Sequence, residues 1–143
     1  MAGDLIQISA ALKMVTDMER IGDQAEDIAE IIPFLQGRDL ENDDLIRKMA
    51  EATIQMVNKS IDAYVKKDPV LARRVIAQDD TVDSFFLEMK TQLIGMIAEN
   101  PGRGEEALDL LMVSKYFERI GDHAVNIAQW VIYSVTGKMK GEA

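Results

Sequence analysis

The spacing of apolar residues restricts this chain to helices. Between Asp4 and Ile32, apolar side chains recur every three or four residues, at positions 8, 11, 14, 18, 21, 25, 28 and 32, which is the period of one helix face. The same period predicts three more helices, over 43–67, 69–99 and 104–136. No stretch alternates with period two over a useful length, so no strand is expected. We therefore predict an all-α chain, an antiparallel helical bundle of four long helices in up-down order.

Helix-breaking residues separate these predicted helices. Proline and glycine disfavour continuation of a helix, and an aspartate before a proline is a typical restart because it can cap the next helix. At 143 residues the chain is expected to form a single domain, 1–143. Residues 34–36 are expected to form a short connection and 138–143 a frayed tail. The breaks, in order, are Pro33 with Gly37, Asp68-Pro69, and Asn100-Pro101-Gly102.

A twelve-residue motif occurs twice, at 18–29 and 117–128, and eight of its twelve positions are identical. On a helix, residues four apart stack on one ridge, and this ridge flanks the apolar stripe. We therefore expect it at the shoulder of a helix–helix contact. Each copy also holds a mid-helix glycine, Gly22 or Gly121, which costs ~1 kcal/mol relative to alanine and suggests close approach of a neighbouring helix. The ridge residues are Glu19, Asp23 and Asp27 in the first copy and Glu118, Asp122 and Asn126 in the second.

The predicted third helix carries a further acidic group. Carboxylates that project from facing helices repel one another unless they are protonated or bridged by a cation, and carboxylate-rich bundles bind hard metal ions. We therefore favour a metal site, for iron, manganese, magnesium or zinc, over a solvated acidic face. The first-copy ridge has no second aspartate cluster to face and is expected to be the weaker site. The complete site would combine Asp79, Asp80 and Asp83 with Glu118, Asp122 and Asn126.

The bulk properties exclude several classes of protein. A net charge of −9 argues against nucleic-acid binding. There is no cysteine, no secretory signal is visible, and no apolar run is long enough to insert in a membrane, so a cytoplasmic protein is expected. The one histidine, His123, falls roughly opposite the ridge and is interpreted as an exposed side chain. No catalytic constellation can be assembled, so no enzymatic activity is expected. Two roles are open for Trp130 and Tyr133: they form a surface for a partner, or their rings pack against a neighbouring helix.

The doubled motif resembles the signature of the PhoU family of phosphate-uptake and phosphate-signalling regulators. The segment Asp4–Lys13 and the Asp79-Asp80-x-x-Asp83 run are also similar to that family, and the resemblance covers nearly the whole chain. It implies two three-helix repeats, metal ions held by Glu/Asp-x-x-x-Asp motifs, and negative regulation of phosphate uptake. It also implies two partners, a sensor histidine kinase and the ATPase of an ABC phosphate transporter.

Two departures from the family pattern affect the interpretation. Gln24 stands where family members usually place histidine after the motif aspartate. The resemblance also implies that the chain begins at the equivalent of the third helix of the first repeat, so that the two preceding helices are expected to be lacking, either because the sequence is a fragment or because the protein is a naturally short member. The first helix should then expose part of its apolar seam, and we expect a homodimer that covers it. Our preferred function is a metal-binding signalling adaptor; the alternatives are a carboxylate-bridged metal enzyme and a metal-free structural interaction module.

Overall fold

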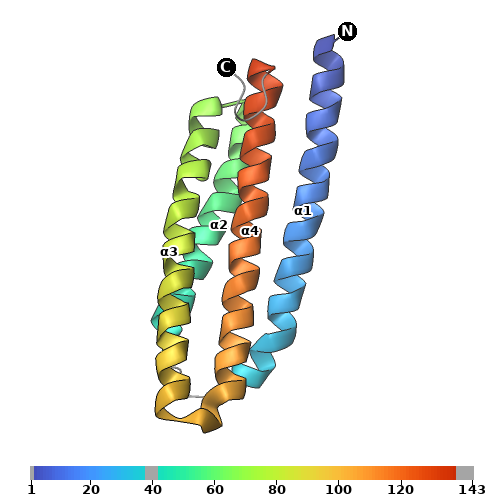
Figure 1. Cartoon of the computed structure of the whole chain (residues 1–143). Helices are drawn as coiled ribbons and strands as arrows, with labels where there is room; N and C mark the ends of the chain where they lie inside the picture. The colour runs from blue at the N-terminus through green and yellow to red at the C-terminus, as the bar shows by residue number, and fades with distance from the viewer. Residues whose placement is uncertain (1, 38–41, 138–143) are drawn as a thin grey trace.

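The computed structural model describes residues 2–37 and 42–137, which form four long helices (Figure 1). The helices are α1 (Ala2–Leu35), α2 (Asp43–Lys66), α3 (Pro69–Glu99) and α4 (Gly104–Thr136), with a single 3-10 turn, η1 (Pro101–Arg103), before α4. The described parts contain no strand, so the predicted all-α bundle is confirmed. The predicted frayed tail, 138–143, lies outside the described residues.

Sequential helices run antiparallel, and α4 is the central element (Figure 1). Helices α2, α3 and α4 pack together as a three-helix unit, whereas the backbone of α1 contacts only that of α4 among the described helices. One hydrogen bond also joins α1 to the end of α2, from Lys67 Nζ to Gln7 Oε1 at 2.7 Å. Methionines fill the core, and Met49, Met56 and Met89 are fully buried. The architecture is thus one three-helix unit with a fourth helix attached along α4.

The connection between α2 and α3 follows the predicted cap. Asp68 accepts hydrogen bonds from the backbone N–H groups of Val70 and Leu71 at 3.0 and 3.1 Å, and Pro69 opens α3. This arrangement satisfies two of the N–H groups that a helix start leaves without an intrahelical acceptor. Lys67 ends α2 in the left-handed region, at φ 51°.

The predicted break at Pro33 is wrong, because α1 continues through Pro33 to Leu35. A proline removes one backbone hydrogen bond and crowds the carbonyl four residues earlier, but here only one helical turn follows. Leu35 is 6% exposed and packs in the lower core with Leu45 and Leu110. We attribute the extra turn to the burial of Leu35. The chain then bends at Gly37, at φ 79°.

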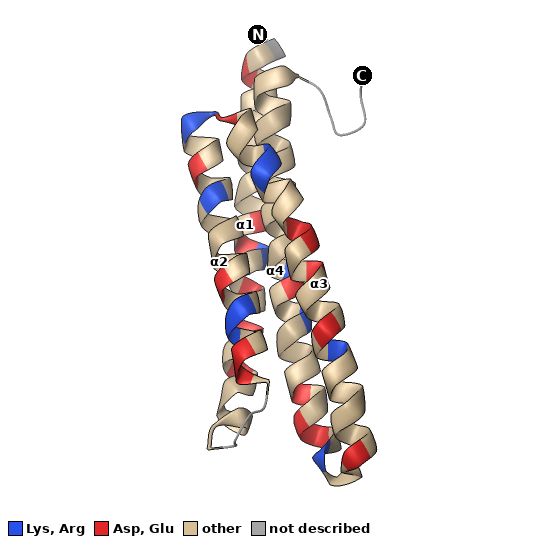
Figure 2. Ribbon diagram, turned by 90° about the vertical axis from the view of Figure 1, so that its left-hand side faces the viewer, with Lys and Arg blue, Asp and Glu red and all other residues tan. Residues whose placement is uncertain are grey.

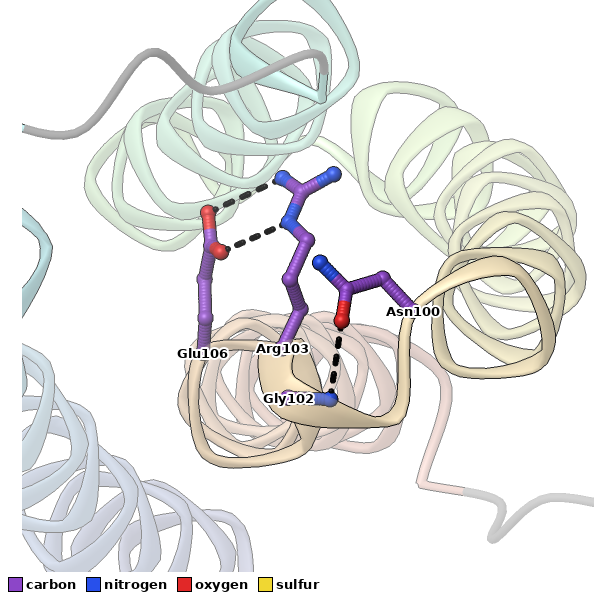
Figure 3. Close-up of polar contacts among 4 residues, drawn as sticks. All are labelled: Asn100, Gly102, Arg103 and Glu106. Atoms are coloured by element: carbon purple, nitrogen blue, oxygen red, sulfur yellow. Dashed lines mark hydrogen bonds and ion pairs between the residues drawn. The ribbon is translucent and has the colours of Figure 1, made fainter.

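The corner between α3 and α4 is fixed by two local interactions (Figure 3). Asn100 Oδ1 accepts from the backbone N–H of Gly102 at 3.0 Å. The guanidinium of Arg103 donates to both carboxylate oxygens of Glu106, from Nε at 3.0 Å and from a terminal nitrogen at 3.2 Å. Glu106 is 4% exposed, so the two-point contact with Arg103 compensates its burial. The predicted end of α3 at Asn100 is confirmed.

The side of α1 that faces away from α4 is apolar in its first half. Four side chains are 57–68% exposed, and their spacing of three, four and three residues places them on one stripe. This exposure was expected from the sequence. None of the described helices is long and apolar enough to cross a membrane. The stripe consists of Leu5, Ile8, Leu12 and Val15.

Candidate functional site

Carboxylates from α3 and α4 meet at mid-height of the bundle (Figure 2). Burial and then repulsion, from Asp83 first and from Asp122 next, raise the pKa of Asp79 from 3.8 to about 6. Burial, followed by the charges of Glu118 and Asp122, also raises the pKa of Asp83. Since each of these groups perturbs another across the helix pair, α3 and α4 bring Asp79, Asp83, Glu118 and Asp122 together as predicted. We call these four residues the acidic cluster.

The backbone of α4 leaves room for Asp79. A Cβ atom built on Gly121 would lie 3.4 Å from Asp79 Oδ1 and 3.7 Å from the sulfur of Met56. Oδ1 of Asp79 is itself buried and has no hydrogen-bond partner in the described structure. A buried carboxylate oxygen without a donor is costly, and a cation would satisfy it. This orphaned oxygen is the feature of the acidic cluster that fits a metal ion.

The acidic cluster is short of positive charge. Lys115 Nζ lies 2.5 Å from Glu118 Oε1 and also 5.3 Å from the centre of the Phe86 ring. Burial and Glu118 raise the pKa of Asp122, while Lys115 and His123 oppose that rise. One lysine therefore faces four carboxylates, so the site retains negative charge at neutral pH. Such a surplus favours binding of a hard divalent cation.

The side chains as placed do not form a complete coordination sphere. Among the described residues, no three His, Asp or Glu side chains converge closely enough to hold a metal ion. Repulsion between carboxylates keeps them apart, so a bound cation would have to draw Asp79, Glu118 and Asp122 inward by side-chain rotation. Asp80, which was predicted with this group, is exposed on α3 but contributes to the raised pKa of Asp79.

The first copy of the motif has no facing helix within the described chain. Glu19 and Asp23 are exposed, and Asp27 is partly exposed. A Cβ atom on Gly22 would meet nothing within 4 Å. The predicted close approach of a neighbouring helix at this glycine is therefore wrong for this chain, although it holds at Gly121. The acidic ridge of α1 faces the same side as the exposed apolar stripe.

Two residues of the second copy face α1 instead of the acidic cluster. His123 Nδ1 lies 3.0 Å from Asp17 Oδ1, and the amide nitrogen of Asn126 donates to the same oxygen at 3.3 Å. The interpretation of His123 as an exposed side chain is wrong, because it is 24% exposed and paired across the α1–α4 contact. Asn126, predicted with the metal ligands, directs its amide to α1.

Asp17 was not among the residues predicted from the sequence, although its position on an apolar helix face pointed to a role. It is 8% exposed and lies four residues before Ile21, on the apolar stripe that packs against α4. A carboxylate in an apolar seam requires a partner from the facing helix. His123 and Asn126 supply that partner, and this polar contact fixes the register between α1 and α4.

An antiparallel helical bundle with a carboxylate cluster between two of its helices defines a class of carboxylate-rich helical proteins. The comparison with protein families identifies which one. The PhoU domain model matches residues 1–32 and 46–131, and the chain belongs to the PhoU family.

Curated relatives and solved structures agree with this membership. The chain is 36% identical over 140 residues to the phosphate-specific transport system accessory protein PhoU homolog of Clostridium acetobutylicum, covering 96% of this chain and 63% of that protein. It is 38% identical over 139 residues to the homolog of Aquifex aeolicus, with 96% and 63% coverage. The chain thus spans about three-fifths of the length of these relatives.

The fold also matches solved PhoU structures. The crystal structure of PhoU from Pseudomonas aeruginosa superposes with a TM-score of 0.92 at 34% identity, covering 96% of this chain and 67% of that one. PhoU from Streptococcus pneumoniae gives a TM-score of 0.89 at 20% identity, a likeness of fold alone.

Proposed function

We propose that this chain is a cytoplasmic, non-enzymatic regulator of phosphate transport that uses a bound metal ion to organise its surface. Its relatives are named as accessory proteins of a phosphate-specific transport system. The observation that carries the metal part of the proposal is the buried, unpartnered Oδ1 of Asp79 beside Gly121. The acidic cluster around it supplies hard oxygen ligands of the kind that magnesium, manganese or iron bind.

The metal ion would act by changing the electrostatics between α3 and α4. When bound, a divalent cation supplies positive charge at the contact. Asp79 would present its buried oxygen, Asp83 and Asp122 the flanking carboxylates, and Glu118 would exchange its contact with Lys115 for the ion. Because this relieves repulsion between helices, we expect metal binding to stiffen the bundle and present a defined face to a partner.

The proposed partners are a sensor histidine kinase and the ATPase of an ABC phosphate transporter, toward which the protein acts as a negative regulator of uptake and signalling. The family membership and the names of the relatives support this assignment. This role requires binding surfaces and no catalytic group.

We further propose that two copies of this chain associate through the outward stripe of α1. The four exposed aliphatic side chains of this stripe form a row that a second copy could cover. Sedimentation at rising protein concentration tests this proposal, with Leu12→Lys as the variant and Leu108→Lys, on an exposed site of α4, as the control. A concentration-independent monomer would refute it.

Elemental analysis of the protein purified in non-chelating buffer tests the metal proposal. We expect bound metal in the wild type, loss of it in Glu118→Gln/Asp122→Asn, and retention of most of it in the matched first-copy variant Glu19→Gln/Asp23→Asn. Equal loss in both variants would assign the metal elsewhere. Absence of metal from the wild type after incubation with manganese or iron would refute the metal site and favour a metal-free interaction module.

A further inference from the structure

One corner of this acidic protein is basic. The α2–α3 corner, defined as residues 65–74, holds four of the 16 Lys and Arg residues of a chain with a net charge of −9 (Figure 2). The only acidic residue of the corner, Asp68, is engaged as the cap of α3. Lys66, Arg73 and Arg74 are exposed and form no ion pair with any residue in the described ranges. These three side chains are therefore free to bind an anionic surface.

The same corner exposes aliphatic side chains between its cations. Val65, the last but one residue of α2, is 72% exposed, and Val70, in the first turn of α3, is 57% exposed. On α4, Val135 is 44% exposed, and the whole segment from Ile127 to Gly137 carries no charged residue. Positive and apolar side chains thus share this end of the bundle.

Aromatic residues lie at the same level. Asp79 lies against Gly121, so the antiparallel register of α3 and α4 places Trp130 and Tyr133 beside the start of α3. Their rings form an edge-to-face pair with centroids 5.6 Å apart, and both side chains are partly exposed. Tryptophan and tyrosine are enriched at membrane–water interfaces because each combines an apolar ring with a polar group.

We propose that the α2–α3 corner, with Trp130 and Tyr133, docks on the anionic headgroups of a lipid bilayer. Lysine and arginine near an anionic leaflet are attracted to lipid phosphates, while short aliphatic and aromatic side chains settle at the headgroup boundary. The corner lies at one end of the bundle, where α1 and α4 extend beyond it (Figure 1), so the bilayer would meet the side of this end. No helix inserts, since the bundle stays intact and only its end makes contact.

The acidic cluster does not cancel this attraction. Asp79 lies five residues beyond Arg74, about 7.5 Å further along the helix axis; this is close to the Debye length of roughly 8 Å at physiological ionic strength, so the charge of Asp79 is partly screened at the corner. The corner therefore acts as a local positive patch. The proposal goes beyond the metal-dependent role, and its test involves no metal ion, so either can fail without the other.

Vesicle binding by the full chain, in chelating buffer, tests this contact. The single tryptophan, Trp130, is the reporter, and co-flotation with vesicles is the second readout. We expect a blue shift of its emission and flotation with phosphatidylcholine vesicles that contain phosphatidylglycerol, with affinity at least about tenfold above that for pure phosphatidylcholine and decreasing with salt. Equal affinity for the two vesicle types, or binding to neither, would overturn the proposal.

Two charge-reversal variants assign the contact. Arg73→Glu/Arg74→Glu should bring the affinity for phosphatidylglycerol vesicles down to the phosphatidylcholine level. Arg47→Glu/Lys48→Glu makes the same charge change at the opposite end of α2, on exposed side chains, and should bind within about twofold of wild type. Equal losses in both variants would overturn the assignment to the corner, with circular dichroism confirming the fold of each. An identical emission shift with inorganic phosphate alone would show a soluble-anion site instead.

Discussion

Replacing Asp79 with asparagine should stabilise the metal-free protein at neutral pH. The pKa of Asp79 is raised from 3.8 to about 6, so the folded state holds this proton more tightly than the unfolded chain does. Stability from this group is then fully present at low pH and falls as the pH rises from about 4 to about 6. Above that range the ionised Asp79 is repelled by its neighbours, and Asp79→Asn removes the repulsion.

The size of the effect follows from the pKa difference. At 1.36 kcal/mol per pKa unit, the change from 3.8 to about 6 has an upper limit of ~3 kcal/mol. Since Asp79 is partly exposed and water screens its neighbours, we expect a net gain of about 1 kcal/mol at pH 7.5. At pH 4.5 the wild-type carboxyl is largely protonated in the folded state, so the variant and the wild type should be nearly equal.

Urea unfolding followed by circular dichroism, with a chelator present, measures this difference. With a slope near 2 kcal/mol per molar urea, the midpoint of Asp79→Asn should move up by about 0.5 M at pH 7.5. Asp62→Asn, an exposed aspartate on α2, is the control and should leave the midpoint unchanged at both pH values. A destabilised Asp79→Asn at pH 7.5 would show that the ionised carboxylate is net stabilising, which would refute the repulsion argument.

Substitutions test three other features of the bundle. Asp68→Ala should cost about 1 kcal/mol in the free energy of unfolding, because the first turn of α3 loses its cap; thermal melting measures it, and an unchanged melting temperature would deny the cap a role. Gly121→Leu should destabilise by at least ~2 kcal/mol, since the side chain would press into the Asp79 carboxylate, while Gly22→Leu should be neutral or stabilising; similar effects of the two variants would contradict the packing difference. Asp17→Ala should leave His123 without its partner and cost ~1–3 kcal/mol, seen as faster amide exchange along α1 with α2 and α3 unchanged.

The helices were predictable from sequence because their apolar spacing and their breaks are local. Asp68 and Pro69 define the connection between α2 and α3 through interactions within four residues, so this connection can be predicted from the local sequence. The predicted helix end at Pro33 was wrong because a non-local contact decides where α1 ends. The local preference of Pro33 to end the helix is outweighed by the burial of Leu35 against residues far along the chain, and no local pattern contains that contact.

The candidate site was partly predictable for a similar reason. The i, i+4 ridges correctly gathered Asp79 and Asp83 opposite Glu118 and Asp122. A ridge of i, i+4 residues also turns slowly around the helix, by about 40° per step, so its third member can face another neighbour. Asn126 shows this, because its amide donates to Asp17 on α1. Which neighbour each residue meets depends on the placement of α1, which the sequence pattern does not specify.

The two copies of the motif differ where α1 contacts α4. The copies are 99 residues apart, so Gln24 corresponds to His123 and Asp17 to Tyr116. In the antiparallel contact Asp17 meets His123, and a symmetric arrangement therefore sets Gln24 opposite Tyr116. The Oε1 atom of Gln24 is buried without a hydrogen-bond partner in the described chain. One half of this quasi-symmetric contact is thus closed by the contact between Asp17 and His123, and the other half has no such contact.

That asymmetry predicts where α1 opens first. A buried unpaired amide oxygen weakens its surroundings by about 1–3 kcal/mol, whereas the pair of Asp17 with His123 holds the other half. Amide exchange should therefore be faster around Gln24 than around Asp17, although both lie well inside the same helix. Gln24→Leu, which removes the unpaired oxygen and keeps a similar volume, should slow exchange in the Gln24 half alone. Faster exchange after this substitution would show that the amide has a stabilising contact and that the two halves do not differ as proposed.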